Sequence, residues 1–362
     1  MGPRRARPDA RLARGVVRRR AGGGTHRVTG TPDPHEAAAR TPEPATASTG
    51  DAPTNASGRR RRWLVNGVKI AFMVAVVVAG ALYIAGKWDE VSDAVRSMDP
   101  LWLVLAFLSV VVALVLSMLS WIVVWPAFDV RLPVLRGGRV FFVSQLGKYL
   151  PGSVWPIAAQ AQMAGEVGLA KSSSIVLSLI SMLVSIATGL GVGAVLVPFI
   201  DPRLLQDYWW LPVVGVAFLV CLTPPVMGFG VRLALRVLRR PDAPFSYGWR
   251  VGGSSAVLQA GNWLFAGVQL WLVLIGLGVD PARSFIPSIA AMSLAFALGV
   301  LLIPFPAGLG VREFVLTAVL ASVTGPAVAV TAAVLSRLLY AIADFAMAGV
   351  AVSVGRRDRS RP

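Results

Sequence analysis

The sequence predicts an all-α polytopic membrane protein, with about six full transmembrane helices and two re-entrant helix pairs in inverted repeats. Of the 362 residues, 55% are hydrophobic and only 15% are charged, whereas a soluble domain carries about 25% charged residues. Between Leu64 and Val354 the charges fall almost entirely in short gaps between long apolar runs. Two of those runs are interrupted by proline and glycine, a pattern typical of re-entrant segments in transporters.

Residues 1–62 are predicted to be a disordered basic tail in the cytoplasm. They contain 14 arginines and 5 acidic residues, and they have too few apolar residues to form a core. No apolar segment typical of a secretory signal peptide stands near the start. Basic residues next to a membrane span favour the cytoplasmic side and attract anionic lipid. Because no aromatic-interleaved basic module is present, we expect no nucleic-acid partner.

Six apolar runs are long enough to cross a bilayer. We expect full spans at 64–86, 101–125, 174–199, 209–231, 253–278 and 327–354. Each has at least 23 residues, which is enough for a hydrocarbon core of about 30 Å. A transmembrane domain is therefore expected over 63–355, followed by a second basic cytoplasmic tail at 356–362.

The charges in the gaps predict how the spans are threaded. The 87–100 loop is mostly acidic and is expected outside, while 129–139, 232–250 and both termini are basic and are expected inside. This threading requires the interrupted regions 140–165 and 284–323 to return to the side from which they enter. The halves 64–199 and 209–354 then have the same order of elements and are inverted in the membrane. The alternative is that each interrupted region contains one ordinary kinked span.

The first interrupted region contains the stretch Lys148–Gly152, which we name the first break. Its Pro151 and Gly152 would end one half-helix. An ammonium such as that of Lys148 is unfavourable at membrane depth unless it meets water, a carboxylate or a phosphate. Lys148 and Tyr149 are therefore candidate contacts for a lipid headgroup; the alternative is that Lys148 extends to the cytoplasmic surface.

The second interrupted region contains Pro304–Gly310, which we name the second break. Its Gly308 and Gly310 would let the backbone approach a ligand closely. Arg312 follows with a planar guanidinium suited to phosphate, so we expect Lys148 and Arg312 to hold one anionic headgroup jointly. Glu313 could complement the helix dipole, and a local Arg312–Glu313 salt bridge without a ligand is the alternative.

Three polar residues of the last span lie on one helical stripe. Arg337, Tyr340 and Asp344 are spaced by three and four residues, and they could either neutralise one another or line a cavity. Two other patterns have ordinary structural explanations. The stripe Gln259, Asn262 and Gln269 is typical of interhelical hydrogen bonding, and Gly189 with Gly193 is typical of close helix packing.

No enzyme chemistry is indicated. Cys221 is the single cysteine, and the two histidines, His26 and His35, lie in the tail, so no metal site, catalytic triad or cofactor is expected. The Gly308–Gly310 pair follows no strand and does not indicate a dinucleotide loop.

The stretch Leu146–Trp155, followed by Pro306–Glu313, resembles the lysylphosphatidylglycerol synthase transmembrane-region family, the flippase-like domain of the bacterial multiple peptide resistance factor. The resemblance covers about 64–354 and rests on Tyr149, Pro151, Gly152, Pro306, Gly308, Gly310, Arg312 and Glu313. It implies translocation of an aminoacylated phosphatidylglycerol. The soluble aminoacyl-transferase domain of the full-length synthases is expected to be absent.

The sequence therefore predicts a lipid flippase-like protein that binds or translocates an anionic or aminoacylated phospholipid in the bacterial plasma membrane. One alternative is a membrane scaffold for a separately encoded lipid-modifying enzyme, and another is a lipid-linked transferase. Expected partners are membrane lipids, with a homo-oligomer or such an enzyme as further possibilities.

Overall fold

A computed structural model describes residue 86 and residues 88–149, 155–165, 168–200, 209–237, 245–301 and 310–359. All of these belong to a single compact unit of the chain. The predicted tail at 1–62 and nearly all of the predicted span 64–86 lie outside the described residues, as do most residues of both breaks.

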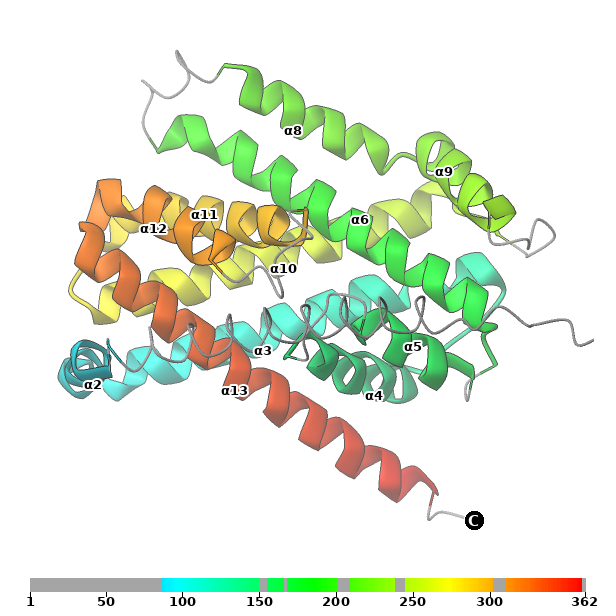
Figure 1. Cartoon of the computed structure of the whole chain (residues 1–362), viewed down its shortest axis with the longest axis horizontal. Helices are drawn as coiled ribbons and strands as arrows, with labels where there is room; N and C mark the ends of the chain where they lie inside the picture. Colours follow the sequence, from blue (N-terminus) through cyan, green and yellow to red (C-terminus); the bar gives the residue numbers. More distant parts are fainter. Residues whose placement is uncertain are drawn as a thin grey trace, which may run out of the picture. The chain divides into compact units, whose positions relative to one another are not determined.

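The described residues form helices and no strands (Figure 1). The α-helices are α2 (Trp88–Ser97), α3 (Pro100–Ile122), α4 (Val134–Gln145), α5 (Trp155–Gly165), α6 (Lys171–Leu196), α8 (Trp210–Cys221), α9 (Pro224–Val237), α10 (Trp249–Gly276), α11 (Pro281–Leu301), α12 (Val311–Thr324) and α13 (Pro326–Arg359). Three short 3₁₀ helices are η1 (Trp125–Phe128), η2 (Leu146–Tyr149) and η3 (Val197–Phe199). The all-α fold class is confirmed.

Five helical segments are long and apolar enough to cross a membrane. They are Pro100–Phe128, Lys171–Phe199, Trp249–Gly276, Pro281–Leu301 and Pro326–Val354. Four of them correspond to the predicted spans 101–125, 174–199, 253–278 and 327–354, which confirms a polytopic membrane protein.

The span predicted at 209–231 is bent, and its two helices together are long and apolar enough to form one broken span. The segment consists of α8 and α9, which meet at an angle of 64°. The cause is Pro224–Pro225, because a residue before proline disfavours the helical region and proline itself is suited to the first turn of a helix. Helix α9 continues to Val237, so Arg232 and Arg236 lie in a helix and not in the predicted loop.

The connection predicted at 87–100 is also more ordered than expected, because it contains α2. The next helix begins at Pro100, where the carboxylate of Asp99 accepts a hydrogen bond of 2.9 Å from the backbone N–H of Leu101. A short connection of this kind fixes where α3 starts.

Both interrupted regions have the predicted order of helix, break and helix. Helices α4 and α5 flank the first break, and α11 and α12 flank the second; α12 packs along α11 (Figure 1). Helix α11 has 21 residues and could cross the membrane by itself. The re-entrant, inverted arrangement therefore stays a prediction.

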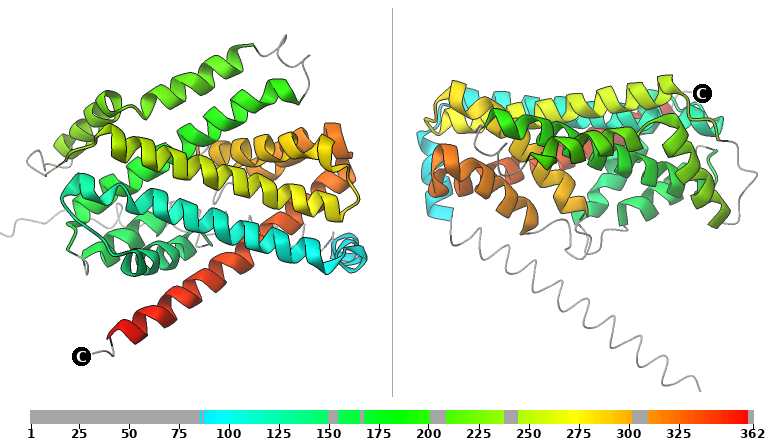
Figure 2. Two further views of the ribbon diagram at one scale, coloured as in Figure 1. Left: turned by 180° about the vertical axis from the view of Figure 1, so that it is seen from behind. Right: turned by 90° about the horizontal axis from the view of Figure 1, so that it is seen from above.

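Helix α10 lies at the centre of the packing and contacts α3, α6, α11 and α13. It runs beside α3 (Figure 2), and the hydroxyl of Ser120 donates a hydrogen bond of 2.8 Å to the carbonyl of Ser255 across this contact. The structural interpretation of the polar stripe is supported by two of its members. Gln259 donates to Ser185 at 3.2 Å, and Gln269 accepts from Ser336 at 2.9 Å.

The glycine pair of α6 provides the predicted close packing. A Cβ at Gly189 would stand 3.0 Å from the carbonyl oxygen of Ser293, and one at Gly193 would stand 2.4 Å from Leu294. Both neighbours belong to α11, so the lack of a side chain at the two glycines lets α6 and α11 approach closely. This fixes α11, the helix that leads into the second break.

Helix α13 contacts elements from both halves of the chain. It packs on α3, α4 and η2 from the first half and on α10 and α12 from the second. Its stripe of Arg337, Tyr340 and Asp344 is thereby placed between the ends of the two breaks.

Candidate functional site

The first side of the site is η2, the 3₁₀ turn that leads into the first break. A Cβ at Gly147 would stand 2.9 Å from the backbone nitrogen of Pro156. Glycine therefore allows the turn to lie against the start of α5. The turn presents Lys148 and Tyr149 to α13.

These two side chains bind the same oxygen of Asp344. The ammonium of Lys148 lies 2.6 Å from Asp344 Oδ2, and the hydroxyl of Tyr149 donates to that oxygen at 2.6 Å. Asp344 is only 2% exposed, whereas the Lys148 side chain is 34% exposed. The Tyr149 ring also stacks on Phe345, with centroids 5.3 Å apart. A buried carboxylate is thus satisfied by one cation and one phenol from the first break.

The second side is the N-terminal turn of α12. Gly310 has a φ of 86°, a region that glycine adopts without strain. Its backbone N–H donates to Glu313 Oε2 at 2.8 Å, as in a helix N-terminal capping box. The other oxygen of Glu313 forms an ion pair with Arg337 of α13.

Arg312 is held in a different way. Its guanidinium carbon lies 3.8 Å from the ring centroid of Phe296 and 5.3 Å from that of Tyr340. One of its nitrogens lies 3.7 Å from the sulfur of Met292. Within the described part of the chain, no carboxylate forms an ion pair with Arg312. The alternative of an Arg312–Glu313 salt bridge is therefore not formed, since Glu313 pairs with Arg337.

The five charged side chains form one group, which we name the break cluster: Lys148, Arg312, Glu313, Arg337 and Asp344. Three of them are cationic and two are anionic, which leaves one net positive charge. Both carboxylates already have a cation, so the excess charge resides on Arg312. Cation–π contacts of a desolvated guanidinium contribute about 2 kcal/mol. These contacts involve aromatic rings and not hydrogen-bond acceptors, so N–H donors of Arg312 remain available for an anion.

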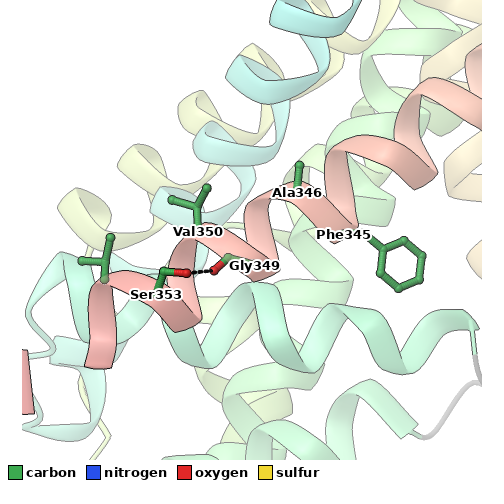
Figure 3. Close-up of a pocket in the computed structure, with 6 residues that line it drawn as sticks. Phe345, Ala346, Gly349, Val350 and Ser353 are labelled. Atoms are coloured by element: carbon green, nitrogen blue, oxygen red, sulfur yellow. Dashed lines mark hydrogen bonds between the residues drawn. The ribbon is translucent and has the colours of Figure 1, made fainter. Parts of the chain in front are cut away.

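An apolar pocket of about 350 Å³ lies along α13 directly after the break cluster (Figure 3). It is lined by Phe345, Ala346, Gly349, Val350, Ser353 and Val354. The hydroxyl of Ser353 donates to the carbonyl of Gly349 at 2.8 Å (Figure 3), so this polar group is already satisfied. Phe345 stacks on Tyr149 and joins the pocket to the cluster.

The structure brings together most of the candidate residues that the sequence indicated. Lys148, Tyr149, Gly310, Arg312, Glu313, Arg337, Tyr340 and Asp344 lie at or beside the break cluster. Gly152 and Gly308 lie outside the described residues. Sequence reasoning missed Met292, Phe296 and Phe345. Only Phe345, which follows Asp344 directly, had a signal that could have found it.

Comparison with known proteins places this arrangement in a family. The model of the lysylphosphatidylglycerol synthase TM region matches residues 68–348, which is more than three quarters of the chain and includes both breaks and the whole break cluster. No curated protein matches the chain. The resemblance seen at the two breaks is confirmed, and the chain belongs to the lysylphosphatidylglycerol synthase TM region family.

Proposed function

We propose that the chain is a flippase-like protein that binds a phospholipid with an anionic or aminoacylated headgroup at the break cluster and moves it across the membrane. Its family and its apolar helices make it a multi-pass membrane protein related to lipid metabolism or transport. We also propose that the chain lies in the plasma membrane of a bacterium, with both termini in the cytoplasm. Its segments 64–199 and 209–354 would form the two inverted halves.

The observation that supports this function best is the state of Arg312. It is partly buried, and its guanidinium rests on Phe296 and Tyr340 without an ion-pair partner in the described residues. A cation at membrane depth is unfavourable, and such residues usually serve a substrate or ion pathway. A phosphate oxygen would supply the missing acceptor, and the planar guanidinium can bind two oxygens at once.

The charge of the break cluster matches a phosphodiester. Its one net positive charge equals the single negative charge of such a headgroup. An ammonium on an aminoacylated headgroup would meet the carboxylates of the same cluster. The apolar pocket beside Phe345 could then receive part of an acyl chain.

The test is translocation of labelled lipids in vesicles that contain the purified full chain. We expect faster movement of a fluorescent phosphatidylglycerol than of a fluorescent phosphatidylcholine. Arg312→Ala should reduce the movement of the anionic lipid about ten-fold or more, because a charge-assisted hydrogen bond contributes about 1.5–3 kcal/mol.

The matched control is Arg283→Ala, which removes the same charge from an exposed position at the start of α11. It should translocate like the unmodified protein. Equal rates for Arg312→Ala and Arg283→Ala would contradict the proposed site. Lipid binding without translocation would instead favour the scaffold alternative.

A further inference from the structure

Asp344 is a buried acid that the proposed contacts to a headgroup phosphate do not use. It is 2% exposed, and it lies in a span that is otherwise apolar. Both of its polar contacts in the described residues come from one short turn, since Lys148 and Tyr149 are consecutive in η2. The neutralisation of Asp344 therefore depends on a single contact between η2 and α13.

Separation of that contact would leave a charged carboxylate in an apolar environment. An unpaired buried charge is strongly unfavourable, whereas the protonated form of the same group is tolerated. Movement of η2 away from α13 is thus favourable only if Asp344 takes up a proton. The same linkage holds in reverse, because a proton on Asp344 removes the attraction that holds Lys148.

We propose that Asp344 is a proton-binding site and that its protonation releases η2, with Lys148, from α13. The proton comes from solvent and binds the carboxylate, and Lys148 keeps its charge throughout. The charge of the break cluster then rises from one to two positive charges. The released ammonium adds positive charge near Arg312, which remains the primary contact for a headgroup phosphate. The role of this proton in lipid movement rests on the proposed function. The inference adds to that function a proton as the ion coupled to transport.

The surroundings of Asp344 support a local switch. Its direct contacts are Lys148 and Tyr149, and on α13 itself Tyr340 and Arg337 lie one and two turns before it. From α12, Arg312 faces Tyr340 and Glu313 holds Arg337.

The remaining elements packed against α13 bring few charges. Helix α3 has no charged side chain, and α10 has only Arg250, in its first turn. The cations of α2 and α4 form no ion pair with Asp344 in the described residues: Arg96 in α2, and Arg136 and Arg139 in α4. Asp89 and Asp93 of α2 are acidic like Asp344 itself. Lys148 is therefore the cation whose contact responds to the proton.

The first test uses the lipid-free protein in detergent and compares thermal unfolding midpoints between about pH 5 and 8. In Lys148→Gln the charged form of Asp344 is penalised only in the folded state, so stability falls as pH rises. Its midpoint should rise by about 5 °C or more on acidification, measured relative to the Lys148→Gln/Asp344→Asn double variant. The unmodified protein, measured relative to Asp344→Asn, should show no such rise on acidification, because its Asp344 is paired with Lys148.

Parallel pH curves for Lys148→Gln and the double variant would overturn the proposal, since Asp344 would then bind no proton in this range. A second measurement avoids the Lys148 variant altogether. Calorimetric titration with phosphatidylglycerol in two buffers of different ionisation enthalpy should show proton uptake by the unmodified protein, and none by Asp344→Asn.

Equal uptake by both proteins in this titration would also overturn the proton site. Failure of the unmodified protein to bind the lipid at any pH would instead contradict the proposed function. The thermal curves would still decide whether Asp344 binds a proton.

Discussion

The two breaks present opposite charges to the same helix. At the first break, a cation of the break, Lys148, pairs with a carboxylate of α13, Asp344. At the second break the polarity is reversed, because a carboxylate of the break, Glu313, pairs with a cation of α13, Arg337. The second break also supplies Arg312, whose neighbours are aromatic rings and not a carboxylate of the described residues.

This difference gives Lys148 and Arg312 different roles, although the sequence predicted the same role for both. Lys148 and Arg312 were expected to hold one headgroup jointly, and that expectation remains untested. In the structure Lys148 is already bound to a buried carboxylate, whereas Arg312 has donors to spare. The first break is therefore suited to hold the helices together, and the second to bind an anion.

The largest expected effect is a difference in stability between two variants, each of which removes the cation from one of the two ion pairs. Lys148→Gln leaves Asp344, which is 2% exposed, without a cation, whereas Arg337→Gln leaves Glu313, which is 25% exposed and keeps its bond to Gly310. Breaking a buried pair costs about 3–5 kcal/mol. The partly buried Glu313–Arg337 pair is more open to solvent and should contribute less, since a surface pair contributes about 1 kcal/mol or less.

The measurement is the free energy of unfolding in detergent near neutral pH. Lys148→Gln should lose clearly more stability than Arg337→Gln, and Asp344→Asn should restore most of the loss when added to Lys148→Gln. Equal losses for the two single variants would show that both breaks are held to α13 with similar strength, which would contradict the expected difference between them.

A smaller effect is expected from one substitution made at two tyrosines. Tyr149→Phe removes the donor to Asp344 but keeps the ring that stacks on Phe345. It should cost about 1–3 kcal/mol, because the buried carboxylate loses one of its two polar partners. Tyr340→Phe keeps the ring beside Arg312, and its hydroxyl has no hydrogen-bond partner in the described residues. Its effect on unfolding should be near zero, and a loss equal to that of Tyr149→Phe would contradict the distinction.

Much of the fold could be predicted from the sequence because bilayer spans follow from length and apolar composition. The spans of α3, α6, α10 and α13 were found in this way. The bend between α8 and α9 was missed, although Pro224–Pro225 was a visible signal for it. Composition alone could not decide whether α11 is a span or half of a re-entrant pair, since its length fits both.

The candidate site was predictable where chemistry is unusual for a membrane. Lys148, Arg312 and Asp344 stood out because charges at bilayer depth are rare. Their pairing was not predictable, because a sequence does not show which break faces which turn of α13. A local Arg312–Glu313 salt bridge was one alternative, yet Glu313 reaches Arg337. Phe296 gave no signal, since one more aromatic residue in an apolar helix is ordinary.

Lipid affinity near neutral pH tests most directly whether Arg312, and not Lys148, is the primary anion contact. Binding of phosphatidylglycerol in nanodiscs should be compared for Arg312→Ala and for Lys148→Ala/Asp344→Asn, which removes the first ion pair without leaving a buried charge. We expect about a ten-fold or greater loss for Arg312→Ala and about a three-fold or smaller loss for the double variant. A larger loss for the double variant, or unchanged binding by Arg312→Ala, would contradict the account.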